Sequence, residues 1–176
     1  MKSLSIIVPC YNEGKKIIDN ISSIREYLKT EFSNIEYEII VVNDGSNNQE
    51  TNDIFKKNKI DNVIFVSYMK NRGKGYAIKK GIERAKNDVI IFMDADLSTD
   101  LSAVKLVTEN IKDFDIVIGS RRHKNSYIEE NQPLHRRVMG TLCIYITRIV
   151  TGIKFKDTQC GFKGLKKDIA KKIIEK

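Results

Sequence analysis

Two aspartates separated by one residue, Asp94 and Asp96, follow the apolar run at residues 89–93. Such a run predicts a buried strand, so both carboxylates would lie at its carboxyl end, where the chain bends. Carboxylate oxygens are the ligands that Mg²⁺ and Mn²⁺ prefer, and both ions are readily shared with a diphosphate. The pair therefore indicates a metal site, although a polar strand end with Asp96 or Ser98 capping the next helix would explain the same residues.

Two other polar clusters contain residue types that bind nucleotides. The segment Asn43-Asp44-Gly45-Ser46 is a good turn sequence, and Asp44 could also accept a hydrogen bond from a nucleobase N–H. The segment Gly73-Lys74-Gly75 precedes a helical pattern and could hold phosphate oxygens on its backbone N–H groups. It matches neither the P-loop nor the dinucleotide-binding fingerprint, because Ile78 stands where the latter needs its third glycine.

Three arginines, Arg121, Arg136 and Arg137, could hold phosphate oxygens through paired charge-assisted hydrogen bonds. Arginine is more often an exposed surface residue, so the residue type alone leaves both interpretations open. The two histidines have no metal-ligand spacing to each other or to a cysteine. We therefore expect them to be non-catalytic, and we expect Cys160, which has no identifiable His or Asp partner, to be a packed residue.

These clusters lie between elements that alternate along the chain. Apolar runs predict strands at residues 4–8, 37–42, 63–66, 89–93 and 116–118. Helical spacing of apolar residues predicts helices around residues 17–28, 51–57, 77–85, 101–111 and 134–149, with a lysine-rich helix at the end. The alternation predicts an α/β fold with a mostly parallel sheet covered by helices on both faces. In such a sheet ligands bind beyond the carboxyl ends of the strands, where the polar clusters lie.

The charge of the chain is concentrated in its last third. Residues 121–176 hold 14 Lys or Arg and 5 Asp or Glu, whereas the formal net charge of all 176 residues is +8. This asymmetry favours an anionic partner such as phosphate or a membrane surface, although a solvated basic face is equally consistent with it. No RNA-binding signature accompanies the charge, so we expect no nucleic-acid partner.

Composition and cysteine use narrow the class of protein further. With 41% hydrophobic and 31% charged residues, the chain is neither disordered nor a membrane-embedded bundle. Three cysteines without a CxxC spacing favour a reducing, cytoplasmic compartment. No apolar run has the length of a membrane span, and no signal-peptide core follows the first residues.

Six short motifs, taken in order, resemble the family 2 glycosyltransferases, and in particular the dolichyl-phosphate glucosyl- and mannosyltransferase branch. The motifs are Val8-Pro9-Cys10-Tyr11-Asn12-Glu13, Asn43-Asp44-Gly45-Ser46, Asn71-Arg72-Gly73-Lys74-Gly75, Asp94-Ala95-Asp96-Leu97, Gly119-Ser120-Arg121 and Asp157-Thr158-Gln159-Cys160-Gly161-Phe162-Lys163. Each motif is weak alone, but six in sequence are specific, and together they cover nearly the whole chain. The last motif is the one that points to the polyprenyl-phosphate branch.

The resemblance implies a GT-A fold, a nucleoside-diphosphate sugar donor and a divalent metal, Mg²⁺ or Mn²⁺. It implies that the nucleotide-sugar is bound by Pro9, Tyr11, Glu13, Asp44, Ser46, Lys74, Asp94 and Ala95. The metal would be held by Asp94 and Asp96, and the acceptor phosphate by Arg136 or Arg137. Asp96, Arg121 and Asp157 would take part in catalysis, Asp157 near the reacting centre.

The implied activity is inverting transfer of a hexose to a polyprenyl or dolichyl phosphate, by an enzyme held peripherally at the cytoplasmic face of a membrane. Ser98 and the Gly-Ser-Arg-Arg-His segment look more like the glucosyl members, so the resemblance favours UDP-glucose over GDP-mannose. Three alternatives stay open: a GDP-mannose-dependent mannosyltransferase, a family 2 transferase with a glycan acceptor, and a non-catalytic nucleotide-sugar-binding module.

The resemblance also implies a domain organisation. We expect residues 1–176 to form a single catalytic domain, with residues 1–121 binding nucleotide and metal and residues 122–176 facing the acceptor and the membrane. Members of this branch normally continue well past the last motif. We therefore expect the chain to be shortened at its C-terminus.

Overall fold

The computed structural model describes residues 3–57, 59–120, 134–153, 157 and 160–175, without the side chains of residues 134–138 and 141–143. The chain divides into two compact units, one made of Met1–Val117 and Gly161–Lys176 and the other of Ile118–Cys160. Residues 161–176 thus return to the first unit, whereas the sequence analysis grouped them with the acceptor-facing part. The polar segment from Arg122 to Gln132 lies outside the described residues.

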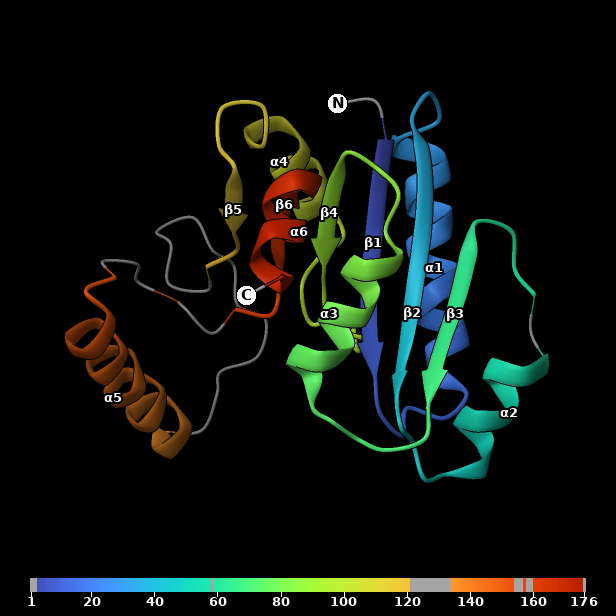
Figure 1. Ribbon diagram of the computed structural model, residues 1–176, viewed down its shortest axis with the longest axis horizontal. Helices are drawn as coiled ribbons and strands as arrows, with labels where there is room; N and C mark the ends of the chain where they lie inside the picture. The colour runs from blue at the N-terminus through green and yellow to red at the C-terminus, as the bar shows by residue number, and fades with distance from the viewer. Residues whose placement is uncertain (1–2, 58, 121–133, 154–156, 158–159, 176) are drawn as a thin grey trace. The chain divides into compact units, whose positions relative to one another are not determined.

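Six strands form one sheet. They are β1 (Ser3–Cys10), β2 (Glu36–Asp44), β3 (Val63–Tyr68), β4 (Val89–Phe92), β5 (Ile116–Ile118) and β6 (Lys163–Lys166). Their order in the sheet is β3-β2-β1-β4-β6-β5 (Figure 1). The pairs β1–β2, β2–β3 and β1–β4 are parallel, and β4 pairs with β6 in the antiparallel sense. The carboxyl ends of β1, β2, β3 and β4 therefore meet at one edge of the sheet.

Helices cover both faces of this sheet. They are α1 (Lys16–Glu31), α2 (Gln49–Lys57), α3 (Lys74–Arg84), α4 (Ser102–Asn110) and α6 (Lys167–Ile174), and the second unit contains α5 (Leu134–Thr151). In Figure 1, α3 and α6 lie in front of the sheet and α1 lies behind it. No helix in the described part of the chain is both long enough and apolar enough to span a membrane.

The hydrophobic core under α3 and α6 is built from alternate strand residues. Its buried members are Ile7, Ile40, Val42, Ala77, Ile82, Ala85, Ile90, Leu165 and Ala170. Helix α3 lies close to β1 at Gly81. A Cβ atom added there would lie 3.0 Å from Ile7 Cδ1, so only glycine fits without a shift of Ile7. Since side chains alternate along a strand, Ile6 and Ile39 point to the opposite face, where α1 buries Ile17 and Ile21.

The structure confirms the predicted α/β class and the five predicted strands, and it adds one strand that the sequence analysis missed. Strand β6 reads Lys-Gly-Leu-Lys, which has neither an apolar run nor an alternation long enough to be recognised. Packing explains the glycine at position 164, because a Cβ atom there would overlap the side chain of Val107 in α4. The strand is thus specified by its neighbours and by the buried Leu165, and little by its own pattern.

Candidate active site

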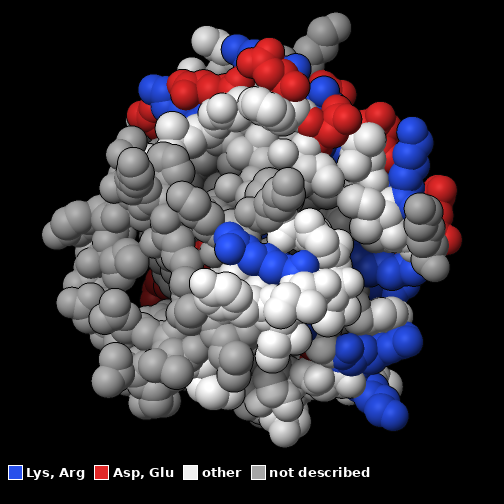
Figure 2. Space-filling model, turned by 90° about the vertical axis from the view of Figure 1, so that its left-hand side faces the viewer, with Lys and Arg blue, Asp and Glu red and all other residues white. Residues whose placement is uncertain are grey.

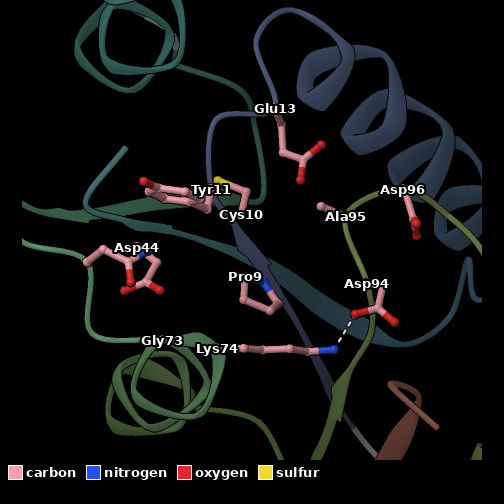
Figure 3. Close-up of a pocket in the computed structure, with 11 residues that line it drawn as sticks. Pro9, Cys10, Tyr11, Glu13, Asp44, Gly73, Lys74, Asp94, Ala95 and Asp96 are labelled. Atoms are coloured by element: carbon pink, nitrogen blue, oxygen red, sulfur yellow. Dashed lines mark hydrogen bonds and ion pairs between the residues drawn. The ribbon is translucent and has the colours of Figure 1, made fainter. Parts of the chain in front are cut away.

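A cavity of about 350 Å³ opens at the sheet edge where β1, β2 and β4 end and α3 begins. This volume is in the usual range for small-molecule sites. Its lining residues are Pro9, Cys10, Tyr11, Glu13, Asp44, Asn71, Gly73, Lys74, Asp94, Ala95 and Asp96. Figure 3 shows them around a common space, with Asp44 and Tyr11 toward one side and Asp94 and Asp96 toward the other.

The two aspartates lie on a tight loop that follows β4. Leu97 has a positive φ of 54°, an uncommon conformation for a residue with a side chain, and it follows Asp96 directly. Asp96 Oδ1 accepts a hydrogen bond from the backbone N–H of Ser98 at 3.0 Å, so this carboxylate also shapes the turn. From α1, the Asn20 amide donates to the Ala95 carbonyl at 2.7 Å and anchors the loop. Neither Asp96 nor Ser98 caps α4, because this helix begins at Ser102 after Leu101 at the N-cap, without a side-chain capping hydrogen bond.

Lys74, the first residue of α3, reaches the side of the cavity where Asp94 lies. Gly73 takes the N-cap position with φ 89°, which favours glycine, and its carbonyl accepts hydrogen bonds from the N–H groups of Tyr76 and Ala77. The Lys74 ammonium forms an ion pair with Asp94 Oδ1 (Figure 3). The Asp94 side chain keeps 33% of its surface exposed and so remains accessible from the cavity.

The donor set fits a hard divalent cation that is shared with a substrate. Asp94 and Asp96 offer oxygen ligands only, as Mg²⁺ and Mn²⁺ prefer. Within the described ranges, no three His, Cys, Asp or Glu side chains come together as a closed metal site. Two carboxylates from the protein, completed by phosphate oxygens and water, are the usual arrangement for Mg²⁺ bound with a nucleotide.

Asp44 lies at the other side of the cavity and is held by residues of the third strand and the loop after it. The strand register places Asp44 directly beside Tyr68. Asp44 Oδ1 accepts hydrogen bonds from the Tyr68 hydroxyl at 2.6 Å and from the Arg72 backbone N–H at 2.9 Å. Burial and this bond to Asp44 raise the pKa of Tyr68 well above its usual value, so the hydroxyl stays a donor. No hydrogen bond to Asp44 Oδ2 occurs among the described residues.

An aromatic and cationic cluster supports this side of the cavity. The Arg72 guanidinium lies 3.7 Å from the centre of the Tyr76 ring, and the rings of Tyr68 and Tyr76 meet edge to face. Such contacts hold the loop at residues 71–73 against β3 and α3. The backbone N–H that Arg72 offers to Asp44 is therefore fixed in place.

Cys10 at the end of β1 and Glu13 just after it have perturbed pKa values. Burial, followed by the charges of Glu13 and Asp44, raises the pKa of the Cys10 thiol from 9.0 to about 12. Burial and the nearby charge of Asp96 raise the pKa of Glu13, and Lys16 opposes this shift. A positive charge placed in the cavity would relieve the repulsion among these acidic groups.

The structure brings eight predicted residues together around one cavity: Pro9, Tyr11, Glu13, Asp44, Lys74, Asp94, Ala95 and Asp96. Ser46 is buried and does not line the cavity. Its hydroxyl accepts a hydrogen bond from the Asn12 N–H and thereby joins the loops after β1 and β2. Arg121 lies outside the described residues, as do the side chains of Arg136 and Arg137 in α5. Asp157 belongs to the second unit, where it is buried and accepts a hydrogen bond from the Cys160 N–H at 3.1 Å.

Sequence reasoning missed Cys10 and Asn71 as lining residues and Tyr68 as the partner of Asp44. Cys10 stands between two predicted residues, and Asn71 lies in a polar cluster after a predicted strand. Their positions in the sequence could therefore have identified both as lining residues. Tyr68 could not be identified this way, because its role depends on the register between β2 and β3.

The sequence profile described as "Glycosyl transferase family 2" matches residues 5–174. The chain belongs to this family. It is 35% identical to the human dolichyl-phosphate beta-glucosyltransferase over 181 residues, which cover 92% of this chain and 54% of that protein. The chain spans about half the length of these dolichyl-phosphate beta-glucosyltransferase relatives.

Solved structures show the same fold at low sequence identity. The mannosyltransferase PcManGT from Pyrobaculum calidifontis, solved with GDP-Man and Mn²⁺, aligns with a TM-score of 0.62 at 18% identity, over 97% of this chain and 46% of that one. Glucosyl-3-phosphoglycerate synthase from Mycobacterium tuberculosis, solved with Mg²⁺ and uridine-diphosphate, gives 0.61 at 14%, over 96% of this chain and 57% of that one. These neighbours confirm the GT-A fold.

Proposed function

We propose that this chain carries the donor site of an inverting glycosyltransferase that moves a glucosyl group from UDP-glucose to a polyprenyl phosphate. The observation that carries the proposal is the cavity in which Asp44 lies on one side and Asp94, Asp96 and Lys74 lie on the other. The two ends of a nucleoside diphosphate match these two sides. The base carries N–H donors at one end, and the diphosphate carries two negative charges at the other. The glucosyltransferase relatives support the sugar and the lipid acceptor.

The hydrogen bonds to Asp44 support a uracil base over guanine. Oδ1 already accepts two hydrogen bonds, from Tyr68 and Arg72, so Oδ2 is the oxygen left to receive a ligand. Uracil presents one ring N–H between two carbonyl groups, which matches a single acceptor. Guanine presents two adjacent donors that a carboxylate binds best with both oxygens.

In the proposed reaction, an acceptor phosphate oxygen forms a bond to the anomeric carbon as the bond to the nucleoside diphosphate breaks on the opposite face. A phosphate monoester has its second pKa at about 6, so its oxygen is already largely ionised at neutral pH and needs no strong general base. Asp157 would orient the acceptor, and Arg121 with Arg136 or Arg137 would bind phosphate oxygens.

The leaving diphosphate gains negative charge as the bond breaks. Held by Asp94 and Asp96, Mg²⁺ or Mn²⁺ would supply Lewis-acid stabilisation of that charge. Lys74 adds a positive charge from the N-terminus of α3, where the helix dipole and the free backbone N–H groups also favour anions. Asp44 fixes the base, so the diphosphate is positioned from both ends.

Helix α5 supports association with a membrane surface, where a polyprenyl phosphate would be presented. Ile146, Ile149 and Val150 are exposed on α5, Ile149 to 81%. The sequence of Leu134–Thr151 contains three arginines and no acidic residue. Apolar side chains and positive charge on one helix are the features that bind anionic lipid surfaces.

The proposal is tested by incubating the chain with radiolabelled UDP-glucose, Mn²⁺ and vesicles that contain a polyprenyl phosphate. We expect label in the lipid fraction, and an Asp96→Asn variant should lose at least about 90% of it, since a metal ligand is removed. Transfer to a soluble glycan, with none to the lipid, would contradict the assignment of a polyprenyl phosphate as the acceptor. It would favour a family 2 transferase with a glycan acceptor. Equally efficient transfer of mannose from GDP-mannose would contradict the assignment of UDP-glucose as the donor.

A further inference from the structure

Gly161 lies against the carboxylate of Asp94. In the pairing of β4 with β6, Val89 lies opposite Lys166 and Phe92 opposite Lys163. Continuing this antiparallel register by two residues brings Gly161 opposite Asp94. Both residues belong to the first unit, although the preceding part of the motif, up to Cys160, belongs to the second.

The contact leaves no room for a side chain at residue 161. A Cβ atom added to Gly161 would lie 2.7 Å from Asp94 Cγ and 2.9 Å from Asp94 Oδ1, and it would overlap Oδ2. Real Cβ atoms essentially never come within 3.0 Å of such atoms, so the carboxylate would have to turn away. Gly161 has no positive φ, so its backbone conformation does not require glycine. The space that Asp94 occupies is the reason that the structure gives for glycine here.

Neighbouring residues hold Gly161 in this position. Phe162 is almost completely buried, and the Lys163 ammonium lies 5.7 Å from the centre of the Phe92 ring on β4. On its other side, the Asp94 carboxylate is paired with Lys74. The carboxylate is therefore enclosed between the backbone at Gly161 and the ammonium group of α3.

We propose that Gly161 is a positioning residue for the metal site: by lacking a side chain, it lets the Asp94 carboxylate take the orientation in which it faces the cavity. The inference rests on the proposed function in one respect, the assignment of Asp94 as a metal ligand. It gives a physical role to the glycine of the Asp157–Lys163 motif, in which Phe162 is buried and Asp157 accepts a hydrogen bond from the Cys160 N–H.

The first test measures Mn²⁺ binding in the presence of UDP by the electron paramagnetic resonance signal of free Mn²⁺. Gly161→Ala should weaken Mn²⁺ binding by about 10- to 100-fold, the usual effect of disturbing a residue that orients a metal ligand. Gly164→Ala, three residues later in β6, is the matched control: its Cβ atom would overlap Val107, so it should lower stability and leave Mn²⁺ affinity unchanged. Wild-type affinity in Gly161→Ala would overturn the inference.

The second test needs no metal and uses a double-mutant cycle with the midpoint of urea unfolding as its readout. Gly161→Ala should lower the midpoint in the wild-type background and leave it unchanged or slightly raised in an Asp94→Ala background, where the obstructing carboxylate is absent. An equal decrease in both backgrounds would overturn the inference. If instead Asp94→Asn binds Mn²⁺ as the wild type does, the metal assignment fails, and the cycle alone decides whether Gly161 positions Asp94.

Discussion

At the scale of single residues, the two ends of the cavity are held in different ways. Asp44 is 4% exposed and has one oxygen engaged by two donors, so its orientation is fixed before any ligand binds. Asp94 is more exposed and its partner is a flexible lysine side chain. The Asp44 end is therefore preorganised, whereas the Asp94 carboxylate can exchange one cationic partner for another.

Tyr68→Phe tests the preorganised end. Removing a hydroxyl that donates to a buried carboxylate should lower the free energy of unfolding by about 1–3 kcal/mol. It should also free one acceptor position on Asp44 Oδ1 and narrow the preference for UDP-glucose over GDP-mannose by about tenfold, or about 1.4 kcal/mol. Urea unfolding and calorimetric titration of both donors with Mn²⁺ measure the two effects.

A matched control for this variant is Tyr37→Phe, which removes a hydroxyl near the opposite end of β2, away from the cavity. Tyr37→Phe should leave the ratio of the two donor affinities at its wild-type value. If Tyr68→Phe leaves that ratio unchanged as well, Tyr68 has no part in base selection.

Cys10 gives a prediction about pH. Its pKa of about 12 lies above the ordinary value of 9.0, so at pH 8 the thiolate fraction is about 10⁻⁴, against about one tenth for an unperturbed thiol. In peptide mapping by mass spectrometry, Cys10 should escape alkylation by iodoacetamide at pH 8 in the folded chain and react in urea. Rapid labelling of Cys10 in the folded chain would contradict the burial and the raised pKa.

The same shift has a consequence for stability, and its sign follows from linkage. A thiol whose pKa is higher in the folded than in the unfolded state binds its proton more tightly when folded. Its contribution to stability is therefore complete below pH 9 and is lost as the pH rises from about 9 toward 12. Cys10→Ala should remove this part of the alkaline loss of stability.

At the scale of elements, the lysine-rich helix α6 has a structural role that its charge alone did not reveal. Lys171 donates hydrogen bonds to the carbonyls of Ile82 and Glu83, at 2.6 and 3.1 Å, near the C-terminal end of α3. From α3, Lys79 donates in return to the Ile174 carbonyl at 2.8 Å. Positive groups at a helix C-terminus satisfy free carbonyls and complement the helix dipole.

Lys171→Ala should therefore destabilise the contact between α3 and α6. We expect the free energy of unfolding to fall by about 1–2 kcal/mol, because two hydrogen bonds from a charged, partly exposed donor are lost. Lys172→Ala, at the exposed neighbouring position, should change it by no more than about 0.5 kcal/mol. Equal effects of the two variants in urea unfolding would show that the bonds of Lys171 contribute nothing specific.

The elements also show why part of the fold could be predicted and part could not. Strands β1, β2 and β4 are buried apolar runs ended by polar residues, so their existence and the place of the site at their carboxyl ends follow from the sequence. Strand β6 has one large apolar residue, Leu165, and its pairing with β4 is a contact between residues far apart in the chain. The roles of Tyr68 and Gly161 depend on strand register, which a single sequence does not encode in a local pattern.

At the scale of the whole molecule, the side chains that give the net charge of +8 do not form one uniform basic surface. Figure 2 shows described side chains of both signs on one face, with acidic ones mainly along its upper edge and basic ones also near its centre and at its lower right. Several of the lysines that make the last third basic have partners: Lys166 pairs with Asp115, and Lys167 and Lys171 donate to backbone carbonyls. Only the ion pair with Asp115 offsets a charge, but all three ammonium groups are held within the protein, whereas α5 combines positive charge with exposed apolar residues.

Isothermal titration calorimetry of UDP-glucose into the chain measures whether donor binding depends on the metal. We expect binding with Mn²⁺, at least about tenfold weaker binding when Mn²⁺ is removed or when Asp94 is replaced in Asp94→Asn, and weaker binding of GDP-mannose. Binding of UDP-glucose that is equally tight without Mn²⁺ and in Asp94→Asn would contradict the account, as would the absence of binding by the wild-type chain.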